Sequence, residues 1–282
     1  MKKIEFDKMH GLGNDYVYLT CMDNVPEHLS ELAVAISDRH FGVGGDGLVV
    51  ITRSDIADFR MIMFNNDGSE AQMCGNASRC IGRLVYEKGL TDKHEFTLET
   101  KAGIKEIRLN FEDGKLKDVS VNMGKPITDG RLVPVVAGET EDGLTVHNLV
   151  IDGRPMKVHA VGMGNPHGVI FEEVDEEFFM KNGRVLEHHE IWPEKANIEF
   201  IKVVGPHEIE MRVWERGTGE TLACGTGACA SAVASMLTGR TQNDVKVKMR
   251  GGELKISLNE KGEVIMTGEA VHVAKGEYYW EN

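Results

Sequence analysis

The sequence repeats itself at an interval of about 150 residues, and this repeat constrains the fold more than any other feature. The motif G-x-G-N occurs at 11–14 and at 162–165, and E-x-x-x-C-G occurs at 70–75 and at 220–225. A weaker match around Gly103 recurs 149 residues later. Three matches in the same order at nearly one offset predict two similar halves, each about half of the 282-residue chain.

Each half combines predicted strands with predicted helices. Alternating apolar residues predict strands at 59–63, 107–111, 119–123, 245–249 and 254–258. Amphipathic spacing predicts a surface helix at 29–36, and each repeated Cys-Gly precedes a helix, at 76–88 and at 226–238. The last of these is apolar nearly all round, as a helix enclosed by a sheet would be. We therefore expect an α+β fold with two pseudo-symmetric half-domains, each a curved mixed β-sheet around a central buried helix.

The junction between the halves is expected near residues 124–126, because no long linker separates them. This prediction assigns residues 1–124 to the N-terminal half-domain and 125–268 to the C-terminal half-domain. The segment around Gly268 partly echoes Met123-Gly124. The last strand, within 269–282, is therefore expected to fold back onto the first half.

Composition excludes several classes of function. The net charge of −13 argues against nucleic acid and against an anionic membrane surface as partners. The first ten residues carry scattered charges and no apolar core, so no signal peptide is expected, and the weakly polar run 222–237 is too short for a membrane span. Five cysteines, an odd number, indicate a reducing compartment, and we expect a cytoplasmic protein. The sequence leaves a homodimer open.

The two repeated cysteines, Cys74 and Cys224, are the strongest candidates for chemistry. Each is expected at a helix N-terminus, where unpaired N–H groups and the helix dipole favour the thiolate and lower the thiol pKa. Buried apolar cysteines are common, and we expect that role for Cys21, Cys80 and Cys229, which have no matched partner.

Two opposed acid/base thiols suit the inversion of a stereocentre. One thiolate removes a proton from one face of the carbon while a thiol delivers a proton to the opposite face. The N–H groups that follow Cys74-Gly75 and Cys224-Gly225 can stabilise the charge that develops on a neighbouring carboxylate. This scheme requires neither a metal nor a carbonyl cofactor, so none is expected.

Four long motifs closely resemble those of the diaminopimelate epimerase family, and the resemblance runs over essentially the whole chain. The motifs are MHGLGNDY (9–16), FNNDGSEAQMCGNASRC (64–80), GMGNPH (162–167) and WERGTGETLACGTGACA (214–230). The resemblance implies an isomerase, independent of pyridoxal phosphate, that interconverts LL- and meso-2,6-diaminopimelate in lysine and peptidoglycan precursor synthesis. It also implies that each half is a mixed β-sheet rolled into a barrel around a central helix, with the active site in the cleft between the halves.

The resemblance also assigns roles to residues. It implies that Cys74 and Cys224 are the acid/base thiols, that His167 and Glu215 assist them, and that Glu215 and Arg216 bind the distal amino acid end of the substrate. The other substrate-binding residues that it implies are Asn14, Asn65, Gly75, Asn76, Asn165, Asn197, Gly225 and Thr226. Some family members carry glutamine at the position of Gly47, so no contact is carried over to that residue.

Three other interpretations remain to be weighed. A proline or hydroxyproline racemase would account for the paired cysteines, but it has no use for Glu215 and Arg216. A thiol-redox or ligand-binding protein would be expected to have a C-x-x-C or close resolving pair, whereas the nearest spacings here are Cys74 to Cys80 and Cys224 to Cys229, both running into predicted helices. A dinucleotide fingerprint at 42–47 follows a predicted helix and precedes a strand, which is the reverse of the order that nucleotide binding requires.

Overall fold

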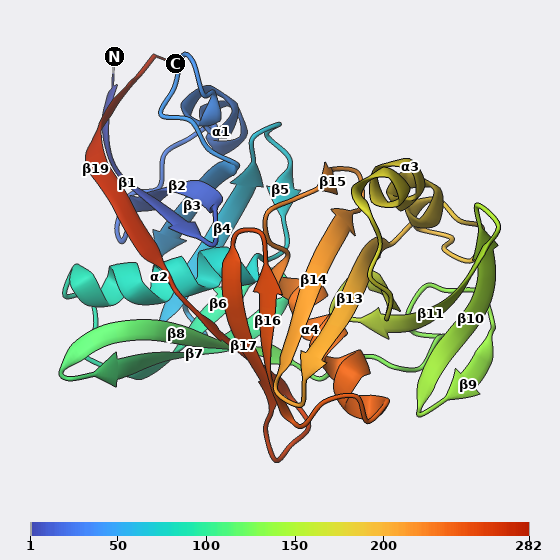
Figure 1. The fold of residues 1–282 in the computed structure, drawn as a ribbon. Helices are drawn as coiled ribbons and strands as arrows, with labels where there is room; N and C mark the ends of the chain where they lie inside the picture. Colours follow the sequence, from blue (N-terminus) through green and yellow to red (C-terminus); the bar gives the residue numbers. More distant parts are fainter. Residues whose placement is uncertain (1, 282) are drawn as a thin grey trace. The chain divides into compact units, whose positions relative to one another are not determined.

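The computed structural model describes residues 2–281 (Figure 1). The chain divides into two compact units, one comprising Met1–Asn122 and Thr267–Asn282, the other Met123–Met266. Met1 and Asn282, the outermost residues of the predicted N-terminal half-domain, lie outside the described residues. The α+β class is confirmed, because helices and mixed β-sheet occur in both units.

Unit 1 is a mixed sheet that carries two helices. Its strand ladder runs in the order β8, β7, β6, β4, β3, β2, β1, β19, with parallel pairs where a helix connects two strands. The elements are β1 (Lys2–Gly11), β2 (Asn14–Thr20), α1 (Leu29–Ser37), β3 (Gly47–Thr52), β4 (Phe59–Asn65), β5 (Glu70–Ala71), α2 (Gly75–Glu87), β6 (Glu95–Thr100), β7 (Gly103–Glu112), β8 (Lys115–Gly124) and β19 (Val271–Trp280).

Unit 2 repeats the same order of elements. Its ladder runs β9, β10, β11, β12, β13, β14, β16, β17, again with parallel pairs at the two helical crossovers. The elements are β9 (Glu139–Glu141), β10 (Leu144–Ile151), β11 (Arg154–Gly162), β12 (Pro166–Ile170), α3 (Glu176–Glu187), β13 (Asn197–Gly205), β14 (Glu208–Glu215), β15 (Gly219–Glu220), α4 (Gly225–Leu237), β16 (Asp244–Met249), β17 (Gly252–Leu258) and β18 (Val264–Gly268).

The curved sheet of unit 1 does not close. Within the described residues, β8 and β19 do not pair with each other. The sheet of unit 1 is therefore open, and the barrel implied by the family resemblance is not closed there.

The first repeated motif, G-x-G-N, builds a tight turn in each unit. Gly13 turns the chain between β1 and β2 with a φ of 84°, and Gly164 does the same between β11 and β12 with a φ of 92°. A residue with a side chain rarely adopts this left-handed backbone, so the turn requires glycine. The turn delivers Asn14 to the start of β2 and Asn165 to the residue before β12.

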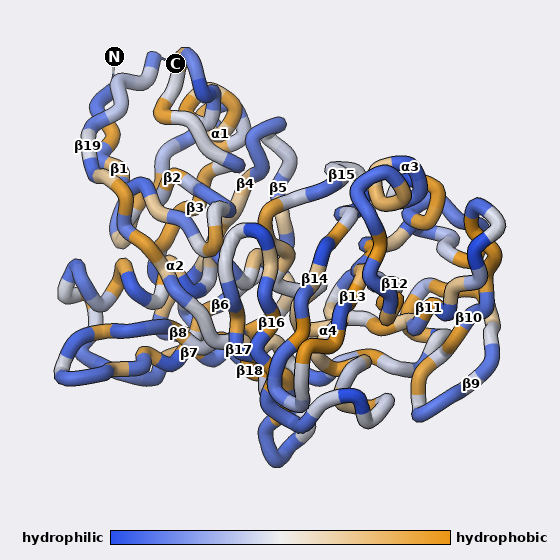
Figure 2. The backbone as a smooth tube through the Cα atoms, in the orientation of Figure 1, coloured by the Kyte–Doolittle hydropathy of each residue, from blue (hydrophilic) through white to orange (hydrophobic). Residues whose placement is uncertain are grey.

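Helices α2 and α4 are the buried helices that the sequence predicts after each Cys-Gly. Ile81, Leu84 and Val85 of α2 are almost wholly buried, and each contributes about 1.5–3 kcal/mol by leaving water. Helix α4 instead buries small residues almost all round, from Gly227 to Met236. Figure 2 shows hydrophobic and hydrophilic residues mixed along the strands, and hydrophilic residues at turns such as that between β7 and β8.

The two buried helices also end alike. Gly89 after α2 and Gly239 after α4 both have positive φ, 66° and 67°. The next residue's N–H, in Leu90 and in Arg240, reaches back to a carbonyl in the last turn of the helix. This glycine-terminated closure satisfies carbonyls that would otherwise be unpaired. The structural repeat therefore extends beyond the motifs that reveal it in the sequence.

Candidate active site

Cys74 and Cys224 occupy matched positions, each as the residue that caps the N-terminus of a buried helix. Cys74 precedes α2 and Cys224 precedes α4, and both have extended backbone. In each case the first helical residue is glycine, Gly75 or Gly225, followed by Asn76 or Thr226. The prediction that the repeated cysteines stand at helix N-termini is confirmed.

In unit 1, Cys74 lies beside two of the predicted asparagines. Its Sγ is 3.3 Å from Asn14 Oδ1, and Asn76 Nδ2 donates to the same oxygen at 3.4 Å. Asn14 in turn donates to Asp46 Oδ2 at 2.8 Å. Arg79, which is fully buried, donates to Asn76 Oδ1 at 2.8 Å. These bonds fix the two amides around the half-buried thiol.

Asn65, another predicted site residue, bonds to the turn that follows its own strand. It ends β4, pairs in register with Gly47, and donates from Nδ2 to Ser69 Oγ at 2.9 Å. Gly47 lies at the start of β3, where an added Cβ would come within 2.1 Å of the Phe64 carbonyl oxygen. The backbone therefore leaves no room for a side chain at Gly47, which explains why a glutamine contact has no counterpart here.

In unit 2, Cys224 is buried and has polar groups on several sides. Its Sγ is 3.5 Å from Thr226 Oγ1 and accepts from the backbone N–H of Gly227 at 3.4 Å. Glu215, which ends β14, accepts from Thr221 Oγ1 at 2.5 Å. The carboxylate of Glu215 is close enough to the thiol to shift its titration.

The prediction of a lowered pKa is wrong for Cys224. Burial raises the pKa of the Cys224 thiol well above its ordinary value, and the nearby carboxylates of Glu215 and Glu199 raise it further. The hydrogen bonds from Thr226 and Gly227 oppose this shift but do not overcome it. Desolvation and like charge therefore outweigh the helix N-terminus, and Cys224 keeps its proton at neutral pH.

The pKa of Glu215 is also raised, and burial is again the main cause. Burial raises the pKa of its carboxyl group, while hydrogen bonds from Thr221 and Cys224 lower it in part. A carboxyl group with a raised pKa next to a protonated thiol is a pair that can exchange a proton. Perturbed groups of this kind concentrate at functional sites.

His167 and Asn197 meet at adjacent positions of the parallel strands β12 and β13. They pair in register, and Asn197 Nδ2 donates to the Pro166 carbonyl at 3.1 Å. His167 is fully buried, with Nδ1 2.7 Å from Glu199 Oε1 and Nε2 2.9 Å from Asn165 Oδ1. Three predicted residues therefore lie together here, and His167 also contacts Glu199, which no motif indicated.

Arg216 is held at its backbone and only lightly at its side chain. Its N–H donates to Asn197 Oδ1 at 3.0 Å, and its Nη1 donates to the Glu194 carbonyl at 3.1 Å. The buried carboxylate of Glu187 fixes the turn that follows by accepting from the Gly217 N–H at 2.8 Å. The exposed guanidinium keeps further donors for a planar carboxylate.

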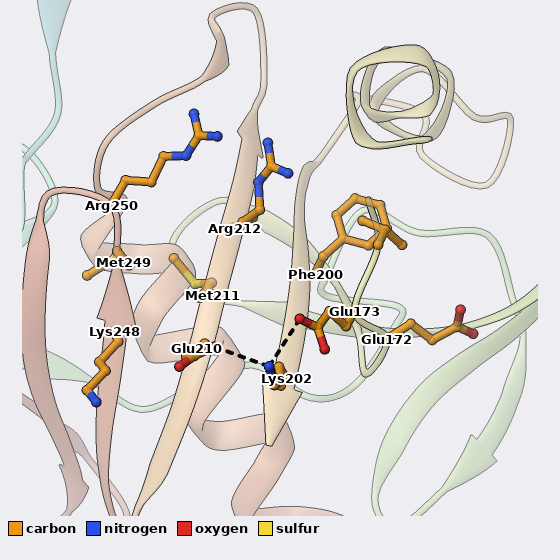
Figure 3. Close-up of a pocket in the computed structure, with 11 residues that line it drawn as sticks. Glu172, Glu173, Phe200, Lys202, Glu210, Met211, Arg212, Lys248, Met249 and Arg250 are labelled. Atoms are coloured by element: carbon orange, nitrogen blue, oxygen red, sulfur yellow. Dashed lines mark hydrogen bonds and ion pairs between the residues drawn. The ribbon is translucent and has the colours of Figure 1, made fainter. Parts of the chain in front are cut away.

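A charged pocket of unit 2 lies elsewhere and contains none of the predicted site residues. It has a volume of about 340 Å³ and is lined by residues of β13, β14 and β16 (Figure 3). Lys202 pairs with Glu173 at 3.1 Å and Glu210 at 3.8 Å. Since Lys202 is already paired with carboxylates, it offers no evident site for an anion in this pocket. Within residues 2–281 no group of acidic, histidine or cysteine side chains could hold a metal ion.

The same fold occurs in other proteins of known structure. It resembles a Bacillus anthracis phenazine biosynthesis protein of the PhzF family, with a TM-score of 0.68, 18% identity, and coverage of 99% of this chain and 100% of the other. It also resembles a probable proline racemase from Agrobacterium radiobacter K84, with a TM-score of 0.66, 16% identity, and coverage of 99% and 93%. At these identities the likeness shows the fold alone.

Sequence comparison then identifies the family. The profile described as diaminopimelate epimerase matches residues 6–128 and 159–273. A curated diaminopimelate epimerase from Acetivibrio thermocellus is 50% identical over 276 residues, covering 97% of this chain and 98% of the relative. One from Methanococcus maripaludis is 47% identical over 281 residues, covering 97% and 99%. The chain belongs to the diaminopimelate epimerase family and is therefore an isomerase.

Proposed function

We propose that this protein interconverts LL- and meso-2,6-diaminopimelate by proton transfer at the α-carbon, without pyridoxal phosphate. The observation that carries the proposal is a matched pair of cysteines at helix N-termini in a chain 50% identical to a curated diaminopimelate epimerase. Lysine and peptidoglycan precursor synthesis is the corresponding cellular role. The substrate is a small amino acid, and the five free thiols agree with a cytoplasmic location.

The proposed chemistry assigns one proton to each thiol. One cysteine, as thiolate, takes the α-proton, and the electron pair of the broken C–H bond moves toward the α-carboxylate. The other cysteine, as thiol, delivers its proton to the opposite face of the carbon and becomes the thiolate. The reverse reaction exchanges the two roles. Cys224, whose burial favours the protonated form, is suited to be the donor when substrate arrives.

The remaining predicted residues are proposed to bind the substrate. The N–H groups of the first turns of α2 and α4, which begin at Gly75 and Gly225, are suited to the α-carboxylate because they offer unpaired donors. Arg216 offers a planar fork for the distal carboxylate and Glu215 a carboxylate for the ammonium group. The other proposed contacts are Asn14, Asn65, Asn76, Asn165, Asn197 and Thr226.

Solvent isotope exchange tests this proposal directly. In deuterium oxide we expect LL-diaminopimelate to gain deuterium at the α-carbon as the meso form appears, because the delivered proton comes from a thiol that exchanges with solvent. Proline, which lacks a second charged end, should neither exchange nor invert. Exchange into proline but not into diaminopimelate would replace the proposal with the proline racemase alternative.

Helices that could span a membrane do not occur among residues 2–281. Light scattering would measure whether the protein forms a homodimer.

A further inference from the structure

Glu199 is a fully buried carboxylate that the proposed chemistry does not yet use. Its Oε1 lies 2.7 Å from His167 Nδ1, and both side chains are 0% exposed. Its second oxygen, Oε2, has no hydrogen-bond partner within the described part of the chain. Burying a carboxylate lowers stability unless hydrogen bonds or an opposite charge offset the cost of desolvation. This arrangement therefore calls for a functional explanation.

The register of the strands shows that this pair is specific to unit 2. His167 lies opposite Asn197 in the pair β12–β13, as Tyr16 lies opposite Gly47 in the pair β2–β3. Two residues further along β3, on the same face, unit 1 has Val49. Unit 2 has Glu199 at that position of β13. The duplicated fold thus places Tyr16 and Val49 in one unit where the other has a histidine and a carboxylate.

Helix α4 makes room for the carboxylate. A Cβ built on Gly227 would lie 2.7 Å from Glu199 Oε1 and 3.3 Å from Cys224 Sγ. The glycine therefore brings the carboxylate and the thiol close to the same point. The matched position of α2, three residues after Cys74, is Ala77, where unit 1 has no carboxylate to accommodate. Unit 2 thus combines Gly227 with Glu199, whereas unit 1 has Ala77 and Val49 at the matched positions. This difference indicates that the space beside Glu199 is specific to unit 2.

We propose that Glu199 is a positioning residue that orients His167 and fixes its tautomer for the epimerase reaction; this inference rests on the proposed function. An ionised carboxylate only accepts hydrogen bonds, so it places a proton on His167 Nδ1. Nε2 is then the nitrogen that exchanges a proton, and when it carries one it donates to Asn165 Oδ1 at 2.9 Å. A base oriented by a third group is a recurring arrangement in enzymes that activate a thiol or hydroxyl group.

Glu199→Gln tests the inference with little change in shape. The glutamine amide can donate to Nδ1 and drive the ring proton to Nε2. In hydrolases that use an oriented histidine, the same change lowers kcat about 10⁴-fold. Here we expect kcat for epimerisation to fall about 10²- to 10⁴-fold with little change in KM. In ¹⁵N-histidine-labelled protein, with His167 assigned by substitution, the Nδ1–H signal should disappear or move to Nε2.

Two further variants keep the test decisive. Gly227→Ala should displace the carboxylate from the other side and cause the same spectral change, which covers the case in which Glu199→Gln does not fold. Glu187→Gln removes another buried carboxylate of unit 2, one that bonds Trp214 and Gly217 instead of His167. It should leave the His167 signal as in the wild type, although it can raise KM through the neighbouring Arg216.

The outcomes separate this inference from the proposed function. A wild-type protein that does not epimerise diaminopimelate overturns the proposed function and, with it, the role of Glu199 in that reaction. A wild type that is active, with a folded Glu199→Gln variant whose kcat is unchanged, overturns the inference alone. An unaltered His167 tautomer in both Glu199→Gln and Gly227→Ala also overturns it.

Discussion

The residues next to each thiol give Cys74 and Cys224 different electrostatic environments. Cys74 is half-buried, and its thiol lies beside the Asn14 amide, to which Asn76 also donates. Cys224 is buried beside the carboxylate of Glu215, with Glu199 close by. In a low-dielectric setting a nearby negative charge favours the protonated thiol. The duplicated helix start is therefore tuned differently in the two units by the residues around it.

Replacement of either repeated cysteine by serine separates acid/base chemistry from binding. In Cys74→Ser and Cys224→Ser the side chain keeps nearly the same shape, so substrate should still bind. A serine hydroxyl is a far weaker acid than a thiol, so turnover should fall by about 10³-fold or more. Each variant should still exchange the α-proton of one stereoisomer with solvent, without inversion, and the two should differ in which one. Near-normal epimerisation by Cys74→Ser would falsify the two-base mechanism.

Arg216→Lys should act on binding instead. Lysine keeps the charge but loses the planar fork that holds a carboxylate through two parallel hydrogen bonds. Loss of one hydrogen bond to a charged group costs about 1.5–3 kcal/mol, so KM should rise about 10- to 100-fold with a smaller change in kcat. Steady-state kinetics at saturating and limiting diaminopimelate measure both values. A fall in kcat with unchanged KM would place Arg216 in the chemistry rather than in substrate capture.

Among the elements, helix α3 supports the candidate site without belonging to it. It connects β12 and β13, the strands that carry His167 and Asn197. Its residue Gly183 packs against Trp214, because an added Cβ would come within 2.5 Å of the indole ring. The helix begins at Asp175, whose side chain accepts from the Phe178 N–H at 2.8 Å. Stability at this helix and activity at the site should therefore be separable.

Asp175→Ala tests that separation. The substitution removes the capping acceptor and should lower the free energy of unfolding by about 1 kcal/mol. Thermal unfolding followed by circular dichroism measures the change, and kcat and KM for diaminopimelate should remain as in the wild type. The conservative Asp175→Asn, which retains a capping oxygen, should recover most of the loss. Equal losses in both variants would show that the cap is not the cause.

At the scale of the whole molecule, buried thiols make the free energy of unfolding depend on pH in the alkaline range. Burial raises the pKa of Cys80 to about 11, whereas an unfolded cysteine titrates near ~8.5. The folded state therefore holds this proton more tightly than the unfolded state. Its contribution to stability is fully present below about pH 8.5 and is lost as the pH rises through 11. The loss by pH 10.5 is about 2–3 kcal/mol.

Cys80→Ala isolates that contribution. Urea unfolding at pH 8 and at pH 10.5, with reductant present, gives the free energy of unfolding at each pH. Between the two the wild type should lose about 2–3 kcal/mol more than the variant, because alanine has no proton to release. Other alkaline groups titrate in both proteins and cancel in the comparison. An identical loss in both proteins would contradict a buried, protonated Cys80.

Local sequence patterns are enough to predict the duplicated topology and the local placement of the cysteines. The glycine turns, the alternating strands and the helix after each Cys-Gly are set by nearby residues, because φ above zero and apolar periodicity are local properties. The family resemblance supplied candidate residues such as His167 and Arg216. Glu199 lay within reach of the same reasoning, since it stands two residues after Asn197 on the same face of a strand.

The pKa of each thiol depends on packing between segments that are far apart in the sequence. A helix N-terminus predicts a lowered pKa from local geometry, yet burial of Cys224 and the approach of Glu215 and Glu199 reverse the shift. Those groups come from different strands, and their distances follow from packing that no local pattern records. The same holds for the buried pair of His167 and Glu199, which depends on the parallel register of β12 and β13 and on the space that Gly227 leaves in α4.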